Sequence, residues 1–114
     1  TIGDPLADIA LPLMFWGEHR HTDPPAFAHV QQISRRSGVH SRRDLAELWS
    51  RETGIGLEHI NYHLCFAFWR LAAIVEGAYV LYRRGRVNTE YARGLENDVP
   101  ALLQEAAAAA KGDW

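Results

Sequence analysis

The sequence predicts an all-α fold built from about four helices. Apolar residues recur at helical spacing in four segments, glycines and prolines mark the boundaries between them, and no stretch shows a clear strand pattern. The chain has 114 residues, which is enough for one compact domain and too few for two. We therefore expect residues 1–114 to form a single helical subdomain.

The first helix is predicted to begin at Pro5. Asp4 suits the capping position because its carboxylate accepts hydrogen bonds from free backbone N–H groups, and proline suits the first helical position. Apolar residues lie on all sides of this segment, so we expect the helix to be buried nearly all round. Pro12 cannot donate to the carbonyl of Asp8, and we expect a kink or an early end there.

A loop-rich segment, residues 17–40, precedes the second helix. It is long for a connection inside a compact domain, which is typical of functional or mobile segments, and we expect at most a helical turn or two within residues 26–35. The second helix is predicted to start after Ser41, with Asp44 completing a capping box, and to stop at Gly54. Its predicted apolar stripe contains Leu45, Leu48 and Trp49.

Two longer helices are predicted in the second half of the chain. One covers about residues 58–84 and stops at Gly85. The other starts near Thr89, continues to about Lys111 and bends at Pro100.

The stretch of residues 64–82 is apolar enough to raise the question of a membrane span. Arg70 and Glu76 lie inside it, and two ionisable groups at mid-span would be costly in lipid. We therefore expect a buried core helix and no membrane partner.

Charge and cysteine content exclude several classes of function. The formal net charge of −2 provides no basic field for nucleic acid or an anionic membrane, so we expect no nucleic-acid partner and solvated Arg35-Arg36 and Arg42-Arg43 pairs. A single cysteine excludes an internal disulfide framework and fits a reducing compartment. The first five residues show neither the basic start nor the apolar run of a signal peptide, and we expect a cytoplasmic protein.

Asp8 is unusual because it lies in the second turn of a helix that is otherwise apolar on every side. A buried carboxylate is costly unless it accepts hydrogen bonds, so Asp8 would need donors close by. The alternative is that Asp8 lies on a solvated edge of the helix. The pattern alone leaves both interpretations open.

Four segments match, in order, the motifs of one enzyme superfamily. Residues 3–10 read GDPLADIA, residues 38–45 GVHSRRDL, residues 53–57 TGIGL and residues 68–79 FWRLAAIVEGAY. They resemble the elements Gly-Asp-Pro-x-x-Asp-[Leu/Ile]-Ala, Gly-x-Pro-Ser-Arg-x-Glu-Leu, Thr-Gly-x-x-Leu and Phe-[Arg/Lys]-Leu-Ala-x-Ile-x-x-Gly-x-Tyr of the aminoglycoside-phosphotransferase and choline-kinase-like superfamily. The form that they resemble most is the phosphotransferase domain that some proteins carry fused to an acyl-CoA dehydrogenase.

This resemblance implies that the chain is the C-terminal helical subdomain of a protein-kinase-like fold and was cut from a longer protein. Asp8 matches the helix aspartate that braces the catalytic loop in this superfamily by accepting backbone N–H groups of that loop. Two positions depart from the pattern: Pro12 replaces an aromatic or aliphatic residue, and His40 stands where proline is common. These departures affect the course of the first helix and the loop before the second.

The residues that transfer phosphate have no match in this chain. Kinase-type transfer requires a lysine for the phosphates, a catalytic-loop aspartate, and an asparagine and an aspartate that hold magnesium. The superfamily carries all of these before the position of Gly3. The resemblance therefore implies no catalytic, cofactor-binding or metal-binding residue here; for the intact protein it implies Mg, ATP and a small-molecule hydroxyl-bearing acceptor.

In the superfamily the third helix lies beside the acceptor pocket, which implies a set of substrate-binding candidates. These are Trp16, Tyr62, His63, Phe66 and Arg70, with Trp69 as a further wall residue. Aromatic residues at helical spacing are more often plain core. The Arg70 cation would either meet a phosphate or carboxylate of the acceptor or form an internal salt bridge, with Glu76 or with an acidic residue of the lobe that precedes this chain. Both interpretations stay open.

Histidine pairs raise the question of a metal site. His59 and His63 are four residues apart and share a predicted helix face, and His19 and His21 lie close together in the loop. Zinc needs three or four ligands, and the sequence has neither an HExxH motif nor a cysteine pair. We expect no metal site.

A rival interpretation is a free-standing, non-catalytic helical interaction or oligomerisation module. Under the phosphotransferase interpretation, loss of the catalytic half uncovers apolar surface on the first helix, including Ile9, Leu13 and Phe15. Exposed apolar surface of this kind drives association, so both interpretations predict a homo-oligomer.

Overall fold

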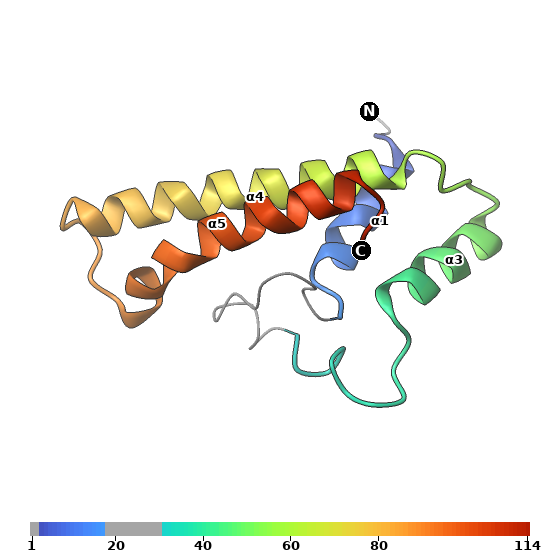
Figure 1. The fold of residues 1–114 in the computed structure, drawn as a ribbon, viewed down its shortest axis with the longest axis horizontal. Coiled ribbons are helices and arrows are strands. Elements are labelled where there is room, and N and C mark those ends of the chain that lie inside the picture. Colours follow the sequence, from blue (N-terminus) through green and yellow to red (C-terminus); the bar gives the residue numbers. More distant parts are fainter. Residues whose placement is uncertain (1–2, 18–30) are drawn as a thin grey trace.

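The computed structural model describes residues 3–17 and 31–114, and this part of the chain is all-α. Four helices follow one another in it: α1 (Pro5–Met14), α3 (Arg42–Thr53), α4 (Ile60–Arg83) and α5 (Glu90–Ala110) (Figure 1). The predicted fold class, all-α with about four helices, is confirmed.

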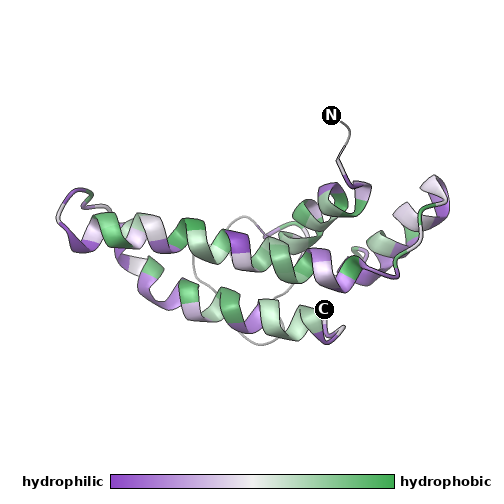
Figure 2. Cartoon of the chain, turned by 90° about the horizontal axis from the view of Figure 1, so that it is seen from above, coloured by the Kyte–Doolittle hydropathy of each residue, from purple (hydrophilic) through white to green (hydrophobic). Residues whose placement is uncertain are grey.

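α4 and α5 form a long antiparallel hairpin that carries most of the core. The two helices lie side by side over most of their length, α1 packs across the first half of α4, and α3 contacts the body mainly through α1 (Figures 1 and 2). The largest fully buried apolar side chains come from α1, α4 and α5: Leu13, Met14, Leu64, Phe68, Leu95 and Leu102.

The predicted capping residues start the helices in the structure. Oδ1 of Asp4 accepts the N–H of Leu6 at 2.9 Å, and the side chain of Thr89 accepts a backbone N–H in the first turn of α5. The capping box of Ser41 and Asp44 is formed in both directions, with two bonds of 3.1 Å. The starts of α1, α3 and α5 therefore follow from local sequence, because each cap satisfies backbone donors that the helix leaves free. α4 begins at Ile60 without a side-chain cap.

The helix ends also follow local sequence. Gly54 and Gly85 take φ values of 74° and 72° after α3 and α4, a region that favours glycine because it has no Cβ. α1 continues through Pro12 and ends two residues later, at Met14. Residues 31–39 form successive turns rather than a helix, and residues 26–30 lie outside the described part.

The prediction that α1 is buried nearly all round is wrong. One face is buried, through Leu6, Ala10, Leu13 and Met14, and the opposite face, which includes Asp8 and Leu11, is exposed. Leu13 therefore belongs to the core and not to the uncovered surface, whereas Ile9 and Phe15 are half-buried. The apolar residues on all sides of this segment suggested full burial, but α1 packs on α4 with one side only.

The predicted apolar stripe of α3 is also partly wrong. Its buried residues are Arg42 and Ala46, Leu45 and Trp49 are half-buried, and Leu48 is exposed. This short helix contacts the rest of the protein mainly near its start. Arg42 and Ala46 are therefore buried by their position in the contact, although other residues of the helix are more apolar.

α4 is a core helix on one side only. Its buried side chains lie on the face that meets α1 and α5, and the other face exposes several large apolar residues. Among the helices of the described part, α4 alone has the length and apolar composition to cross a bilayer, a criterion that core helices of soluble proteins also meet.

Candidate functional site

A hollow between α1 and α3 contains Asp8. Its volume is about 370 Å³, and its lining residues are Pro5, Asp8, Ile9, Trp49, Thr53 and Ile55. The lining is largely apolar, and Asp8 provides its only ionisable side chain among the described residues.

The carboxylate of Asp8 has no hydrogen-bond or ion-pair partner within residues 3–17 and 31–114. The side chain is exposed, so the expectation of a buried carboxylate in this chain is wrong. The reason is geometric, because α1 turns its Asp8 side away from α4. The role of Asp8 in bracing a loop stays a prediction.

Trp16 lies apart from the other substrate-binding candidates. Its indole Nε1–H donates to the carbonyl of His40 at 2.8 Å, and its own carbonyl accepts from Nε of Arg42 at 3.0 Å. Asp4, at the start of α1, instead contacts His63 on α4. α1 has 10 residues, and a helix rises about 1.5 Å per residue, so its two ends are about 15 Å apart. Trp16 follows the end of α1, whereas His63 contacts its start.

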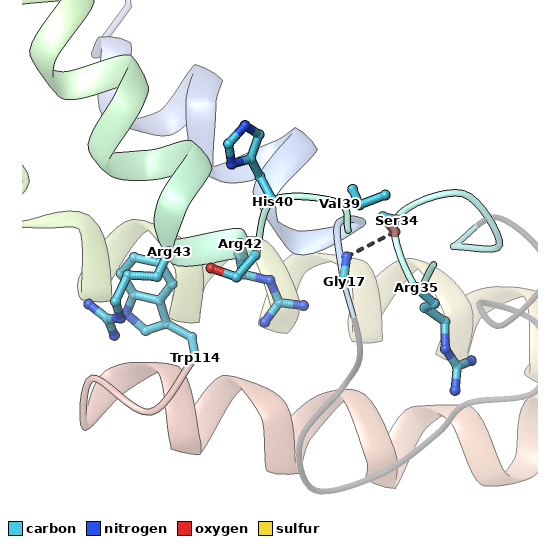
Figure 3. Close-up of a pocket in the computed structure, with 9 residues that line it drawn as sticks. Gly17, Ser34, Arg35, Val39, His40, Arg42, Arg43 and Trp114 are labelled. Atoms are coloured by element: carbon cyan, nitrogen blue, oxygen red, sulfur yellow. Dashed lines mark hydrogen bonds between the residues drawn. The ribbon is translucent and has the colours of Figure 1, made fainter. Parts of the chain in front are cut away.

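Beside Trp16 the structure forms a cleft of about 280 Å³ (Figure 3). Its lining comes from Gly17 after α1, from the turns before α3, from the first turn of α3 and from Trp114. The lining residues are Gly17, Ser34, Arg35, Val39, His40, Ser41, Arg42, Arg43 and Trp114. The wall is closed in part by Gly17, whose N–H donates to Oγ of Ser34 at 2.9 Å.

Sequence reasoning missed this cleft. The pairs Arg35-Arg36 and Arg42-Arg43 were expected on solvated faces, but Arg42 is only 5% exposed. The two arginine pairs were the only signal of this cleft in the sequence. Their approach to one another depends on the tertiary fold. The acidic residue of this corner, Asp44, has its pKa lowered because the backbone and hydroxyl of Ser41 donate to its carboxylate.

An exposed aromatic row runs along the free face of α4. The rings of Tyr62 and Phe66 are nearly parallel, with centroids 6.5 Å apart, and the ring of Phe66 lies 5.9 Å from that of Trp69. The exposed fractions are 68%, 45% and 53%, respectively, so these side chains are not core. The structure thus brings together Tyr62 and Phe66, two of the candidates, with Trp69.

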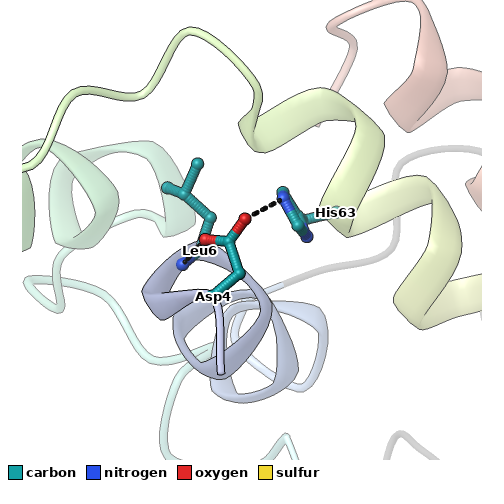
Figure 4. A network of polar contacts seen from close by, with 3 residues as sticks. All are labelled: Asp4, Leu6 and His63. Carbon is teal, nitrogen blue, oxygen red and sulfur yellow. Dashed lines mark hydrogen bonds and ion pairs between the residues drawn. The ribbon is translucent and has the colours of Figure 1, made fainter. Parts of the chain in front are cut away.

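His63 is held at the start of this row. Its Nε2 lies 3.2 Å from Oδ2 of Asp4, and Tyr62 packs edge-on against its ring at 5.2 Å (Figure 4). Asp4 therefore contacts two helices, because its Oδ1 also accepts the N–H of Leu6 at the start of α1. This contact ties the starts of α1 and α4 together, and it gives His63 a structural partner.

Arg70 is exposed on α4, one turn beyond Phe66. It forms no ion pair within the described residues, and the internal salt bridge that the sequence allowed, with Glu76, is not made there. The exposed Arg70 thus lies next to the aromatic row.

Metal-binding groups are sparse in the described part. No three side chains of His, Cys, Asp or Glu come together within residues 3–17 and 31–114. His59 is exposed, His63 is engaged with Asp4, and His19 and His21 lie outside the described residues.

No family model and no solved structure matches this chain. The chain is similar to "Acyl-CoA dehydrogenase family member 11" of Homo sapiens, at 30% identity over 106 residues, and of Rattus norvegicus, at 27% over 106 residues. Each alignment covers 91% of this chain and 13% of the relative. The chain therefore spans only a small part of the length of the curated relatives that it matches.

Proposed function

We propose that this chain is the acceptor-binding helical subdomain of an ATP-dependent small-molecule phosphotransferase. In the intact protein, the γ-phosphoryl group of ATP would pass to a hydroxyl of the acceptor, with Mg and ATP held by residues outside this chain. The four motif segments support the proposal because they occur in the superfamily's order over most of the chain. A cytoplasmic location is part of the same proposal.

The observation that carries the proposal is the state of Asp8. Asp8 has no partner among the described residues and lies in a mostly apolar hollow. The other residues that line this hollow offer its carboxylate no charged partner. A loop that offered backbone N–H groups would satisfy it, and the apolar walls from Ile9, Trp49 and Ile55 would exclude water from the contact. This is the arrangement that a brace for a catalytic loop requires.

The relatives bear on the acceptor. Their name refers to a dehydrogenase family and does not itself name a phosphotransferase. It fits the fused form to which the motifs are similar, and the 13% coverage leaves ample length for other domains. We therefore favour a hydroxyacyl acceptor over an aminoglycoside-like or choline-like one.

The aromatic row and Arg70 are the proposed acceptor surface. Tyr62, Phe66 and Trp69 offer apolar contact, and the exposed Arg70 offers a charge for an anionic group of the acceptor. Trp16 is not part of this surface, and His63 contributes by fixing the position of Tyr62.

The test is phosphoryl transfer by the intact protein. Radiolabelled ATP with Mg should label a hydroxyacyl compound, and Arg70→Gln should raise the KM for that acceptor about tenfold while the KM for ATP stays within about twofold. Arg83→Gln, at the far end of α4, is the matched control and should behave as the wild type. Absence of both nucleotide binding and labelling across all three acceptor classes would overturn the proposal.

One observation favours a second candidate, a non-catalytic interaction module. The free face of α4 exposes large apolar side chains in a row, as interaction surfaces do. Under this alternative the intact protein would neither bind nucleotide nor transfer a phosphoryl group, and substitutions in the aromatic row would change its association with a partner or with itself.

A further inference from the structure

The free face of α4 carries both large and small residues and both signs of charge. Its central residues lie three or four positions apart along the helix, so they share one side. They are Phe66, Trp69, Arg70, Ala73, Glu76 and Gly77, and all six are exposed. α4 lies at one edge of the molecule, and its opposite side packs on α1 and α5 (Figure 1).

Gly77 is not explained by the packing of the described part of the chain. It lies inside α4 without the positive φ that favours glycine, and a Cβ added to it would meet no atom within 4 Å. Glycine inside a helix is less stable than alanine at the same position. A close approach of another surface to the helix backbone would explain its presence.

Large and small residues lie at equal distances from Ala73. Trp69 precedes Ala73 by four residues, and Gly77 follows it by four. In an antiparallel pair of α4 helices that meet at Ala73, residues at equal distances on its two sides lie at the same level. Trp69 of one copy then lies level with Gly77 of the other copy, where the missing side chain leaves room for the indole.

The charges of the face follow the same arrangement. Arg70 precedes Ala73 by three residues, and Glu76 follows it by three. Neither side chain forms an ion pair within residues 3–17 and 31–114. In the antiparallel pair, Arg70 of each copy lies level with Glu76 of the other copy, so opposite charges meet twice. A parallel pair would place like charges at the same level.

We propose that this face binds the same face of a second copy, as an antiparallel pair of α4 helices related by a two-fold axis at Ala73. The aromatic rings alone would fit many apolar partners. The exchange of large for small residues and of positive for negative charge across the axis singles out a second copy of this chain. The inference concerns association and does not rest on the proposed phosphotransferase function. Because both involve Arg70 and the aromatic row, a second copy and an acceptor would exclude each other.

The experiment is disulfide cross-linking of the intact protein carrying Ala73→Cys, with oxygen and copper phenanthroline as the oxidant. The two introduced thiols meet at the axis, so the yield of covalent dimer on a non-reducing gel should exceed the wild-type background about tenfold. Tyr62→Cys is the matched control, because Tyr62 lies on the same face and is 68% exposed. Its two copies would be about 33 Å apart in the antiparallel pair, so this variant should stay at the background level.

Three further substitutions in the Ala73→Cys protein test the contacts. Gly77→Leu favours the helix itself but fills the space of the other copy's Trp69, so it should lower the yield about tenfold. Arg70→Glu and Glu76→Arg should each lower it about tenfold, because like charges then meet. An equimolar mixture of these two proteins should restore it. All three positions are exposed, so the variants should keep the fold, which thermal unfolding checks.

Several results would overturn the inference. Ala73→Cys at the background level would assign the face to another occupant, and equal cross-linking of Tyr62→Cys would indicate a parallel pair or random collision. A higher yield with Gly77→Leu would indicate unspecific apolar association. A mixture that does not restore cross-linking, or an effect of Arg93→Glu on α5 as large as that of Arg70→Glu, would exclude the charge pairing. Cross-linking does not measure phosphoryl transfer, so failure of the proposed function would leave these results unchanged.

Discussion

Asp98 is a fully buried residue of α5 whose two carboxylate oxygens have no hydrogen-bond partner in the part of the chain that the structure describes. Burial raises its pKa above the ordinary value of 3.8, because the charged form loses its hydration without gaining a partner. The folded state therefore holds this proton to a higher pH than the unfolded state. The stability that the neutral acid allows is complete below pH 3.8 and is lost as the pH rises through the raised pKa.

Replacement of Asp98 should stabilise the protein at neutral pH. Asp98→Leu removes a buried polar group without partners and should raise the free energy of unfolding at pH 7 by about 1–3 kcal/mol. Asp98→Asn removes the ionisation, so its advantage over the wild type should grow between pH 4 and pH 7 in chemical denaturation, a range that starts about at the carboxyl's ordinary pKa. A difference between Asp98→Asn and the wild type that does not change with pH would contradict this account.

At the scale of single elements, α3 depends on its caps. The helix has 12 residues and only part of it is packed against the body, so local hydrogen bonds contribute a large share of its stability. The side chain of Ser41 accepts the N–H of Asp44, and the carboxylate of Asp44 accepts the N–H of Ser41.

Ser41→Ala should lower the free energy of unfolding by about 1 kcal/mol, the usual effect of losing a side-chain cap. Thermal unfolding followed by circular dichroism measures the change. Ser37→Ala, in the exposed turn before the helix, is the matched control and should change little. Equal effects of the two substitutions would mean that the cap does not limit the stability of α3.

The contrast between helix boundaries and helix faces shows what the sequence could and could not predict. Capping residues such as Asp4 and Ser41 and stop signals such as Gly54 act through the nearest backbone, so the sequence predicts them correctly. The environment of a side chain depends on distant neighbours. Asp8 is exposed and Arg42 is buried because of how α1 and α3 meet the body, and no local pattern contains that information.

The same limit applies to the candidate site. Helical spacing correctly grouped Tyr62 and Phe66, because residues four apart share a face. It could not place Trp16, which belongs to another element and bonds to the backbone of His40. The basic cleft was missed entirely because its residues come from segments whose approach is set by the tertiary fold.

At the scale of the whole molecule, the most exposed apolar surface lies on the free face of α4. Tyr62, Phe66 and Trp69 extend from one side of a helix whose other side is core, and Leu11 of α1 is also exposed, at 42%. Apolar side chains that lie in a row exclude water together when another surface covers them. The prediction of a homo-oligomer therefore rests on α4 rather than on α1.

We expect this chain to self-associate at micromolar concentration in sedimentation velocity experiments. The double substitution Phe66→Gln and Trp69→Gln should shift it toward the monomer without loss of stability, because both side chains are exposed. Tyr91→Gln, an exposed aromatic on α5, is the control and should leave association unchanged. A wild-type chain that sediments as a monomer would contradict the prediction.

The central claim is that Asp8 receives hydrogen bonds from a catalytic loop outside this chain. The most direct measurement is the turnover number of the intact protein carrying Asp8→Ala, with Glu47→Ala on the exposed face of α3 as the control. Loss of charge-assisted hydrogen bonds of about 1.5–3 kcal/mol should lower turnover about ten- to hundredfold, with ATP affinity nearly unchanged and the control fully active. An Asp8→Ala variant that turns over at the wild-type rate would contradict the claim.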